Sequence, residues 1–95
     1  MHFLYIIYSE KINRYYVGET YDVHIRLQNH LIKFYPKSYT KSANDWVLKL
    51  LFETENRSDA QKLEKFIKKM KSKEFIEKLI LNPEILTEIL QKIKI

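Results

Sequence analysis

The stretch FLYIIYSEKINRYYVG, residues 3–18, decides the fold. It begins with Phe3–Tyr8, a run of apolar, aromatic and β-branched residues that is typical of a buried strand. A polar segment of loop length follows, and Tyr15–Val17 then predicts a second strand that ends at Gly18, the only glycine in the chain. Two short strands joined by a short polar loop predict an antiparallel hairpin.

Beyond the hairpin, the sequence predicts a helix, a third strand and then further helices. The helix begins near Asp22, with Thr20 as a second candidate for its N-cap, and ends before Pro36. The polar residues 37–45 are expected to form a loop, and residues 46–52 have the apolar and aromatic character of a strand.

Three helices are predicted in the second half of the chain. The first opens at Ser58, where Gln61 completes a capping-box pattern, and Ser72 caps the second. The third restarts at Asn82–Pro83, with proline at the first helical position. The predicted order is therefore β-β-α-β-α-α-α, a small three-stranded antiparallel or mixed sheet flanked by helices, in the α+β class.

Length and composition favour one small domain. The chain has 95 residues, of which 45% are hydrophobic and 31% charged, which is too apolar for a disordered chain. The absence of cysteine excludes disulfides and cysteine-bound zinc and fits a cytoplasmic location, and no apolar run reaches the length of a membrane span. We expect a domain over residues 1–81, with residues 82–95 forming an amphipathic helix packed on it.

The basic charge is concentrated after residue 30. The net charge is +5, and residues 57–80 alone carry eight Lys or Arg against four Asp or Glu. Such a surface attracts a polyanion at long range, although lysine-rich helices are often only solvated faces. Nucleic acid is therefore the expected partner, and the charge alone leaves both interpretations open.

A few residues have chemical potential beyond packing. Tyr5 and Tyr16 come from the two hairpin strands, and Arg26 and His30 lie four apart, on one face of the predicted helix. Glu64 lies between Leu63 and Ile67, so it should point toward the core side, where a carboxylate must be paired or bind a cation. Singly, each could be an ordinary rim tyrosine, boundary histidine or structural ion pair.

In combination, these residues resemble the GIY-YIG endonuclease family. Residues 3–5 stand where the GIY triplet belongs, and residues 16–18 stand where YIG belongs. The segment from Gly18 to His30 has the form G-x-x-x-D-x-x-x-R-x-x-x-H, and Glu64 falls at the matching place in the second helix. The resemblance covers about residues 2–80 and is greatest to the small stand-alone bacterial members, which are related to the N-terminal nuclease domain of the excision-repair incision enzyme.

The chain departs from the family pattern at two positions. Phe3 replaces the first glycine of the GIY triplet, a change common among small members. Glu19 stands where the excision-repair relatives have lysine, which removes a phosphate-binding charge near the site.

The resemblance implies a metal-dependent endonuclease and a role for each matched residue. Glu64 would be the sole protein ligand of one Mg²⁺ or Mn²⁺ ion, with water and phosphate oxygens around it. Arg26 would clamp the cleaved phosphate, and Tyr16 would act as general base or position the attacking water. Tyr5 and His30 would orient water and phosphate.

Other residues are expected to contact the nucleic acid, which we take to be DNA recognised by its structure rather than its sequence. They are Gly18, Lys41, Lys49, Lys68 and Lys69. The pathway is open, with DNA repair one candidate.

Two other classes of function remain in competition. One is a non-catalytic nucleic-acid binding module that retains the fold, and the other is an interaction domain that forms a homodimer through its C-terminal helix. The complete set of Tyr5, Tyr16, Arg26, His30 and Glu64 favours the enzyme, because a pure binder needs basic residues and no inward carboxylate.

Overall fold

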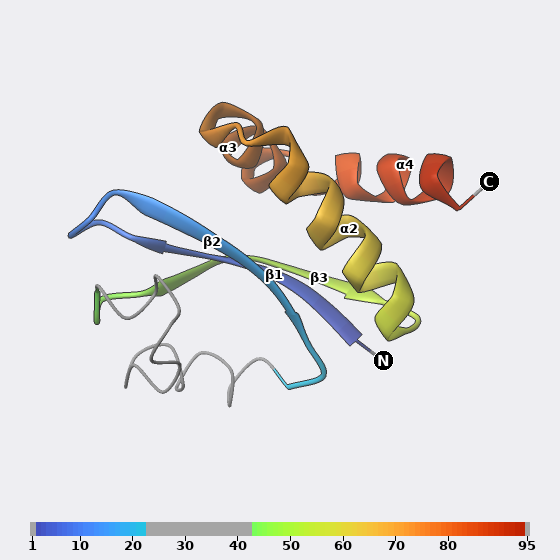
Figure 1. Cartoon of the computed structure of the whole chain (residues 1–95), viewed down its shortest axis with the longest axis horizontal. Helices are drawn as coiled ribbons and strands as arrows, with labels where there is room; N and C mark the ends of the chain where they lie inside the picture. Colours follow the sequence, from blue (N-terminus) through green and yellow to red (C-terminus); the bar gives the residue numbers. More distant parts are fainter. Residues whose placement is uncertain (1, 23–42, 95) are drawn as a thin grey trace.

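A computed structural model describes residues 2–22 and 43–94 of the chain. Three strands form one sheet, and helices pack on one of its faces (Figure 1). The elements are β1 His2–Ser9, β2 Arg14–Thr20, β3 Val47–Thr54, α2 Arg57–Met70, α3 Lys73–Leu81 and α4 Glu84–Ile93. The predicted α+β class is confirmed, while the helix predicted between Asp22 and Pro36 lies outside the described residues.

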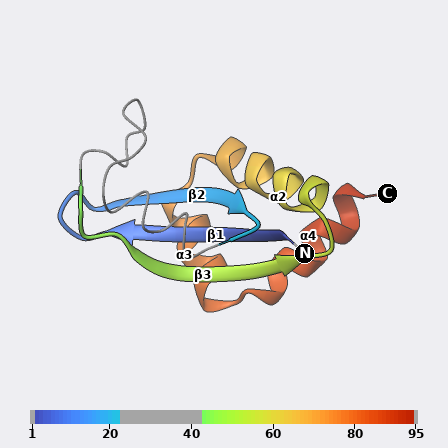
Figure 2. The ribbon, with the colours of Figure 1, turned by 90° about the horizontal axis from the view of Figure 1, so that it is seen from below.

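The sheet has the order β2-β1-β3, and both pairings are antiparallel, so β1 is the central strand (Figure 2). The hairpin register places Tyr5 opposite Gly18 and Ile7 opposite Tyr16. Between β1 and β3 the register shifts after Ile6, which leaves Lys49 as an extra residue in β3.

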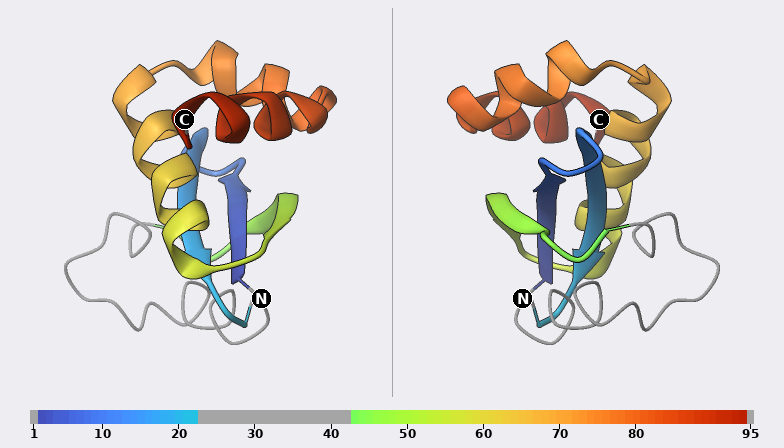
Figure 3. Two further views of the ribbon diagram at one scale, coloured as in Figure 1. Left: turned by 90° about the vertical axis from the view of Figure 1, so that its right-hand side faces the viewer. Right: turned by 90° about the vertical axis from the view of Figure 1, so that its left-hand side faces the viewer.

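Strand alternation gives the two faces of the sheet different side chains. The helix-covered face is aliphatic, and all described helices lie on its side (Figure 3). Its buried core consists of Leu4, Ile6, Val17 and Leu50 from the strands and Leu63, Ile67, Leu79 and Leu86 from the helices. The opposite face, here called the tyrosine face, buries Tyr5 and Ile7 with Ala43 and Trp46. Two separate cores therefore form on the two sides of β1.

Two predicted strand boundaries are wrong. Gly18 does not end the second strand but lies inside β2, where it pairs with Tyr5. The third strand begins at Val47 and continues to Thr54, so Trp46 precedes it and instead packs into the tyrosine face, 3% exposed. Hydrogen bonding to the central strand β1 sets the end of β2 and the start of β3, and a local sequence pattern does not contain this information.

The helix starts agree only in part with the predicted caps. Asn56, and not Ser58, caps α2, because its extended backbone lets its side-chain oxygen accept a hydrogen bond from the Asp59 backbone nitrogen at 2.8 Å. Ser72 caps α3 as predicted, accepting from the Phe75 nitrogen at 3.1 Å. Pro83 is at the N-cap of α4, one residue before the predicted position.

The last helix contributes to the core on the helix-covered face. Leu86 of α4 is fully buried there, and the Lys94 ammonium at its end lies 3.2 Å from the buried Asp59 carboxylate of α2. The division of the chain at residue 81 stays a prediction. Among the residues that the structure describes, no helix has the length and apolar character needed to span a bilayer.

Candidate active site

Gly18 is explained by the tyrosine opposite it. Its backbone does not adopt a positive φ, so no tight turn requires glycine there. A Cβ added to Gly18 would come 2.5 Å from Cζ and 2.8 Å from Cε2 of Tyr5, whose side chain is 1% exposed. The glycine therefore leaves room for the Tyr5 ring, and contact between Gly18 and a nucleic acid stays a prediction.

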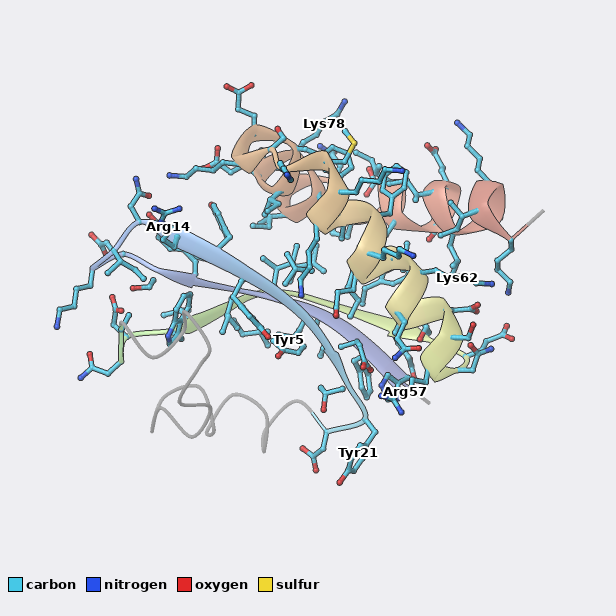
Figure 4. The ribbon with its side chains drawn as sticks, in the orientation of Figure 1. Tyr5, Arg14, Tyr21, Arg57, Lys62 and Lys78 are labelled. Carbon is cyan, nitrogen blue, oxygen red and sulfur yellow. The ribbon has the colours of Figure 1, made fainter. Side chains whose placement is uncertain are left out.

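Tyr16 lies beside Tyr5 on the same face of the sheet. Their ring centroids are 6.3 Å apart and the rings are tilted by 37°. Tyr5 is buried, whereas Tyr16 is half-buried and comes from the edge strand β2. The sticks in Figure 4 show Tyr5 on the side of the sheet away from α3 and α4. The two predicted tyrosines are thus neighbours, with Tyr16 the more accessible.

Glu64 is linked to Tyr16 through Lys68, which contacts both residues. Helix α2 runs beside β2 (Figure 3), and the Glu64 side chain on it is 21% exposed. The Lys68 Nζ atom lies 3.7 Å from Glu64 Oε1 and 5.4 Å from the centroid of the Tyr16 ring. A single ammonium therefore contacts both the predicted metal ligand and the predicted base, and it brings residues far apart in sequence to the same edge of the sheet.

The surface beside Glu64 is a shallow basic hollow of about 520 Å³. Its lining consists of Gln61, Glu64, Lys65, Lys68 and Lys69. Within residues 2–22 and 43–94, no group of three or more His, Cys, Asp or Glu side chains could enclose a metal ion. The described part of the site thus offers a carboxylate beside cations, with space for water and phosphate.

The remaining predicted residues fall into two groups. Arg26, His30 and Lys41 lie outside the described residues. Lys49 lies at the bulge of β3, with its Nζ atom 6.0 Å from the centroid of the Tyr8 ring, whereas Lys68 and Lys69 border the hollow beside Glu64. Because β1 separates β3 from β2, Lys49 belongs to the edge of the sheet opposite Tyr16.

Glu19 is compensated by nearby basic groups. Its side chain is 15% exposed and pairs with the His2 ring, and the Arg57 Nε atom lies 3.6 Å from its other oxygen. The carboxylate at this position is therefore held by two partners, one from β1 and one from α2.

Sequence reasoning missed a group of cations next to Lys68. Arg14 at the start of β2 and Lys71 and Lys73 at the α2–α3 junction line a groove of about 590 Å³, which we call the basic groove. The lysine-rich run after Glu64 indicated a charged helix face, but nothing in it indicated that Arg14 of the hairpin would lie opposite.

In a comparison with known families, the model described as the GIY-YIG catalytic domain matches residues 1–78. Comparisons with curated proteins and with solved structures gave no significant match.

Proposed function

Because the chain belongs to the GIY-YIG catalytic domain family, whose members are nucleases, we propose that it is a metal-dependent endonuclease that cuts phosphodiester bonds in DNA. The observation that carries this proposal is the position of Lys68, whose ammonium lies between the Glu64 carboxylate and the Tyr16 ring. Because one ammonium contacts both groups, the Glu64 carboxylate and the Tyr16 ring lie at the same edge of the sheet, which supports their action on one substrate phosphate.

The residues present fit one hydrated divalent cation. Glu64 supplies a hard oxygen ligand and faces a hollow with room for water, and a bound cation would displace the Lys68 ammonium that lies 3.7 Å from Glu64 Oε1. Glu64 would hold Mg²⁺ or Mn²⁺, which would polarise the phosphate and stabilise the charge on the leaving oxygen.

The protein groups would divide the remaining tasks. Tyr16, half-buried at the sheet edge with the Lys68 ammonium over its ring, would take a proton from the attacking water or position that water. The buried Tyr5 ring would fix the orientation of Tyr16. By family resemblance, Arg26 would bind the cleaved phosphate through two hydrogen bonds, and His30 would orient phosphate and water.

Recognition of DNA structure rather than sequence is part of the proposal. The described surface near Glu64 offers lysines, which contact phosphates in any sequence. A structure-directed nuclease would suit DNA repair.

The decisive experiment replaces Glu64 by glutamine, which keeps the shape and removes the charge. We expect Glu64→Gln to lower cleavage of flapped, branched, nicked or single-stranded DNA at least about a hundredfold, because a cation at the cleaved phosphate contributes several kcal/mol. Mn²⁺ binding, measured by calorimetry, should weaken in parallel. Glu88→Gln, an exposed carboxylate on α4, is the charge-matched control and should leave both unchanged.

One observation favours a second candidate, a non-catalytic nucleic-acid binding module. The Glu64–Lys68 pair is an i,i+4 contact on one helix, a common surface ion pair that needs no metal. If the unsubstituted chain cuts none of these substrates with either metal, yet binds them, the binding module is the better account.

A further inference from the structure

The basic groove combines an apolar floor with a basic rim. Its floor contains the apolar side chains of Val17, Ile67 and Ile76, of which Ile76 is half-buried and the other two are buried, while Arg14, Lys71 and Lys73 are exposed along it. The Tyr15 ring forms part of the lining. None of the described residues that line it is acidic.

Hydrogen bonds across the groove hold its two sides together. The Lys73 Nζ atom of α3 donates to Asn13 Oδ1 at 2.6 Å, and the Tyr8 hydroxyl donates to the same oxygen at 2.5 Å. The Tyr15 hydroxyl donates to Glu77 Oε2 of α3 at 3.2 Å. The hairpin and α3 are thereby fixed at a set separation, so the groove exists before a ligand arrives.

The backbone at the α2–α3 junction directs the lysines to the groove. Lys71 has φ 48° and ψ 40°, a left-handed conformation that ends α2 and reverses the chain. Ser72 then caps α3, and Lys73 opens it. Lys71 and Lys73, which are separated only by Ser72, therefore both line the groove.

This lining matches an unpaired nucleotide. A base with a free face can pack on an apolar floor and an aromatic ring, while its flanking phosphates meet the cations. A duplex keeps its bases stacked and presents phosphates, so it could use the rim but not the floor.

We propose that the basic groove binds an unpaired nucleotide that flanks the bond to be cut. Lys68 lines both this groove and the hollow beside Glu64, so a strand lying in the groove continues directly to the site. The position relative to the cut rests on the proposed nuclease function, whereas binding in the groove does not. The enzyme would accordingly prefer substrates with a single-stranded flank.

The test measures binding in a chelating buffer, so that cleavage plays no part. Fluorescence anisotropy with labelled oligo(dT), and with a blunt duplex of equal length, compares the full chain with two triple variants. One carries Arg14→Gln, Lys71→Gln and Lys73→Gln, and the other carries Lys62→Gln, Lys78→Gln and Lys92→Gln. The second set removes the same charge from exposed positions outside the groove.

We expect the groove variant to bind oligo(dT) at least about tenfold more weakly than the control variant. The slope of log affinity against log salt concentration should fall by up to about 2, because each contact with a single-stranded phosphate contributes ~0.7. Duplex binding should weaken equally in the two variants. An oligo(U) arm distinguishes RNA from DNA, and thermal melting checks that each variant is folded.

A second arm tests the base itself. An oligonucleotide with abasic residues should bind the unsubstituted chain about tenfold more weakly than oligo(dT), and the groove variant should show little of this difference. Equal loss of oligo(dT) binding in both triple variants would overturn the proposal. So would a groove variant whose duplex binding falls by the same factor as its oligo(dT) binding. The Glu64→Gln variant separates the two proposals. Its loss of cleavage tests the nuclease function, and its retained oligo(dT) binding tests the groove independently.

Discussion

The two faces of the sheet are stabilised in different ways. The helix-covered face buries aliphatic side chains from all three strands and from α2, α3 and α4, a continuous core with few polar groups. The tyrosine face buries one tyrosine against a glycine, next to Trp46, and leaves Tyr16 half-buried at the edge. The first face holds most of the buried apolar surface, and the second combines a buried and a half-buried tyrosine, which teaches that one small sheet can bury an aliphatic core on one face and keep a polar phenol at the edge of the other.

The largest expected effect lies on the helix-covered face. Leu63 is fully buried between α2 and the sheet, so Leu63→Ala should lower the free energy of unfolding by about 2–5 kcal/mol, from lost burial and the cavity left behind. Urea unfolding measures this change. Leu81→Ala, at a leucine that is 80% exposed, is the matched control and should change the free energy by less than ~0.5 kcal/mol. Equal losses in the two variants would contradict the assignment of the main core.

A medium effect is expected on the tyrosine face. Gly18→Ala places a methyl group against the buried Tyr5 ring and should cost about 1–3 kcal/mol of stability through overpacking. If Tyr5 orients Tyr16 as proposed, cleavage should fall as well, because the Tyr5 ring must move. Adding Tyr5→Leu should make the two costs less than additive in a double-mutant cycle. Strict additivity would show that the ring is not what excludes a side chain at Gly18.

The smallest effect concerns how stability depends on pH through Asp45, which bonds to the hairpin at Ser9 and Lys11. Hydrogen bonds from the Ser9 hydroxyl at 2.5 Å and the Lys11 backbone nitrogen at 3.0 Å hold the pKa of Asp45 below its usual range. A carboxyl whose pKa is lower in the folded state contributes stability above about pH 4, and this contribution is lost as the pH falls toward the folded-state pKa. The link between residue 45 and the hairpin should therefore weaken in acid.

Asp45→Asn tests this link. We expect a small decrease in Tm at pH 7 and a shallower fall in Tm between pH 5 and pH 2 than in the unsubstituted chain, measured by circular dichroism. Glu88→Gln, an exposed carboxylate on α4, should keep the original slope. If Tm falls with acid as steeply in Asp45→Asn as in the unsubstituted chain, the Asp45 charge does not contribute to stability, and the prediction is wrong.

The sequence predicted most of the fold because its signals are local. Alternating and helical apolar patterns located the strands and helices, and the Ser72 cap is a contact within one turn. Two kinds of error remain. Two residues near the start of α2 could cap it, and Asn56 does so instead of Ser58, whereas the pairing with the distant strand β1 extends β2 past Gly18. Local propensity cannot weigh a hydrogen bond to a distant strand.

By itself, the sequence determined the family, the α+β class and the identity of Tyr5, Tyr16 and Glu64 as residues of interest. Only the tertiary structure decided that Gly18 makes room for a ring, that Lys68 joins Glu64 to Tyr16, and that Arg14 lines a groove with Lys71 and Lys73. The physical reason is that residue type and spacing along one element fix periodicity, whereas strand register and helix docking fix which distant side chains meet.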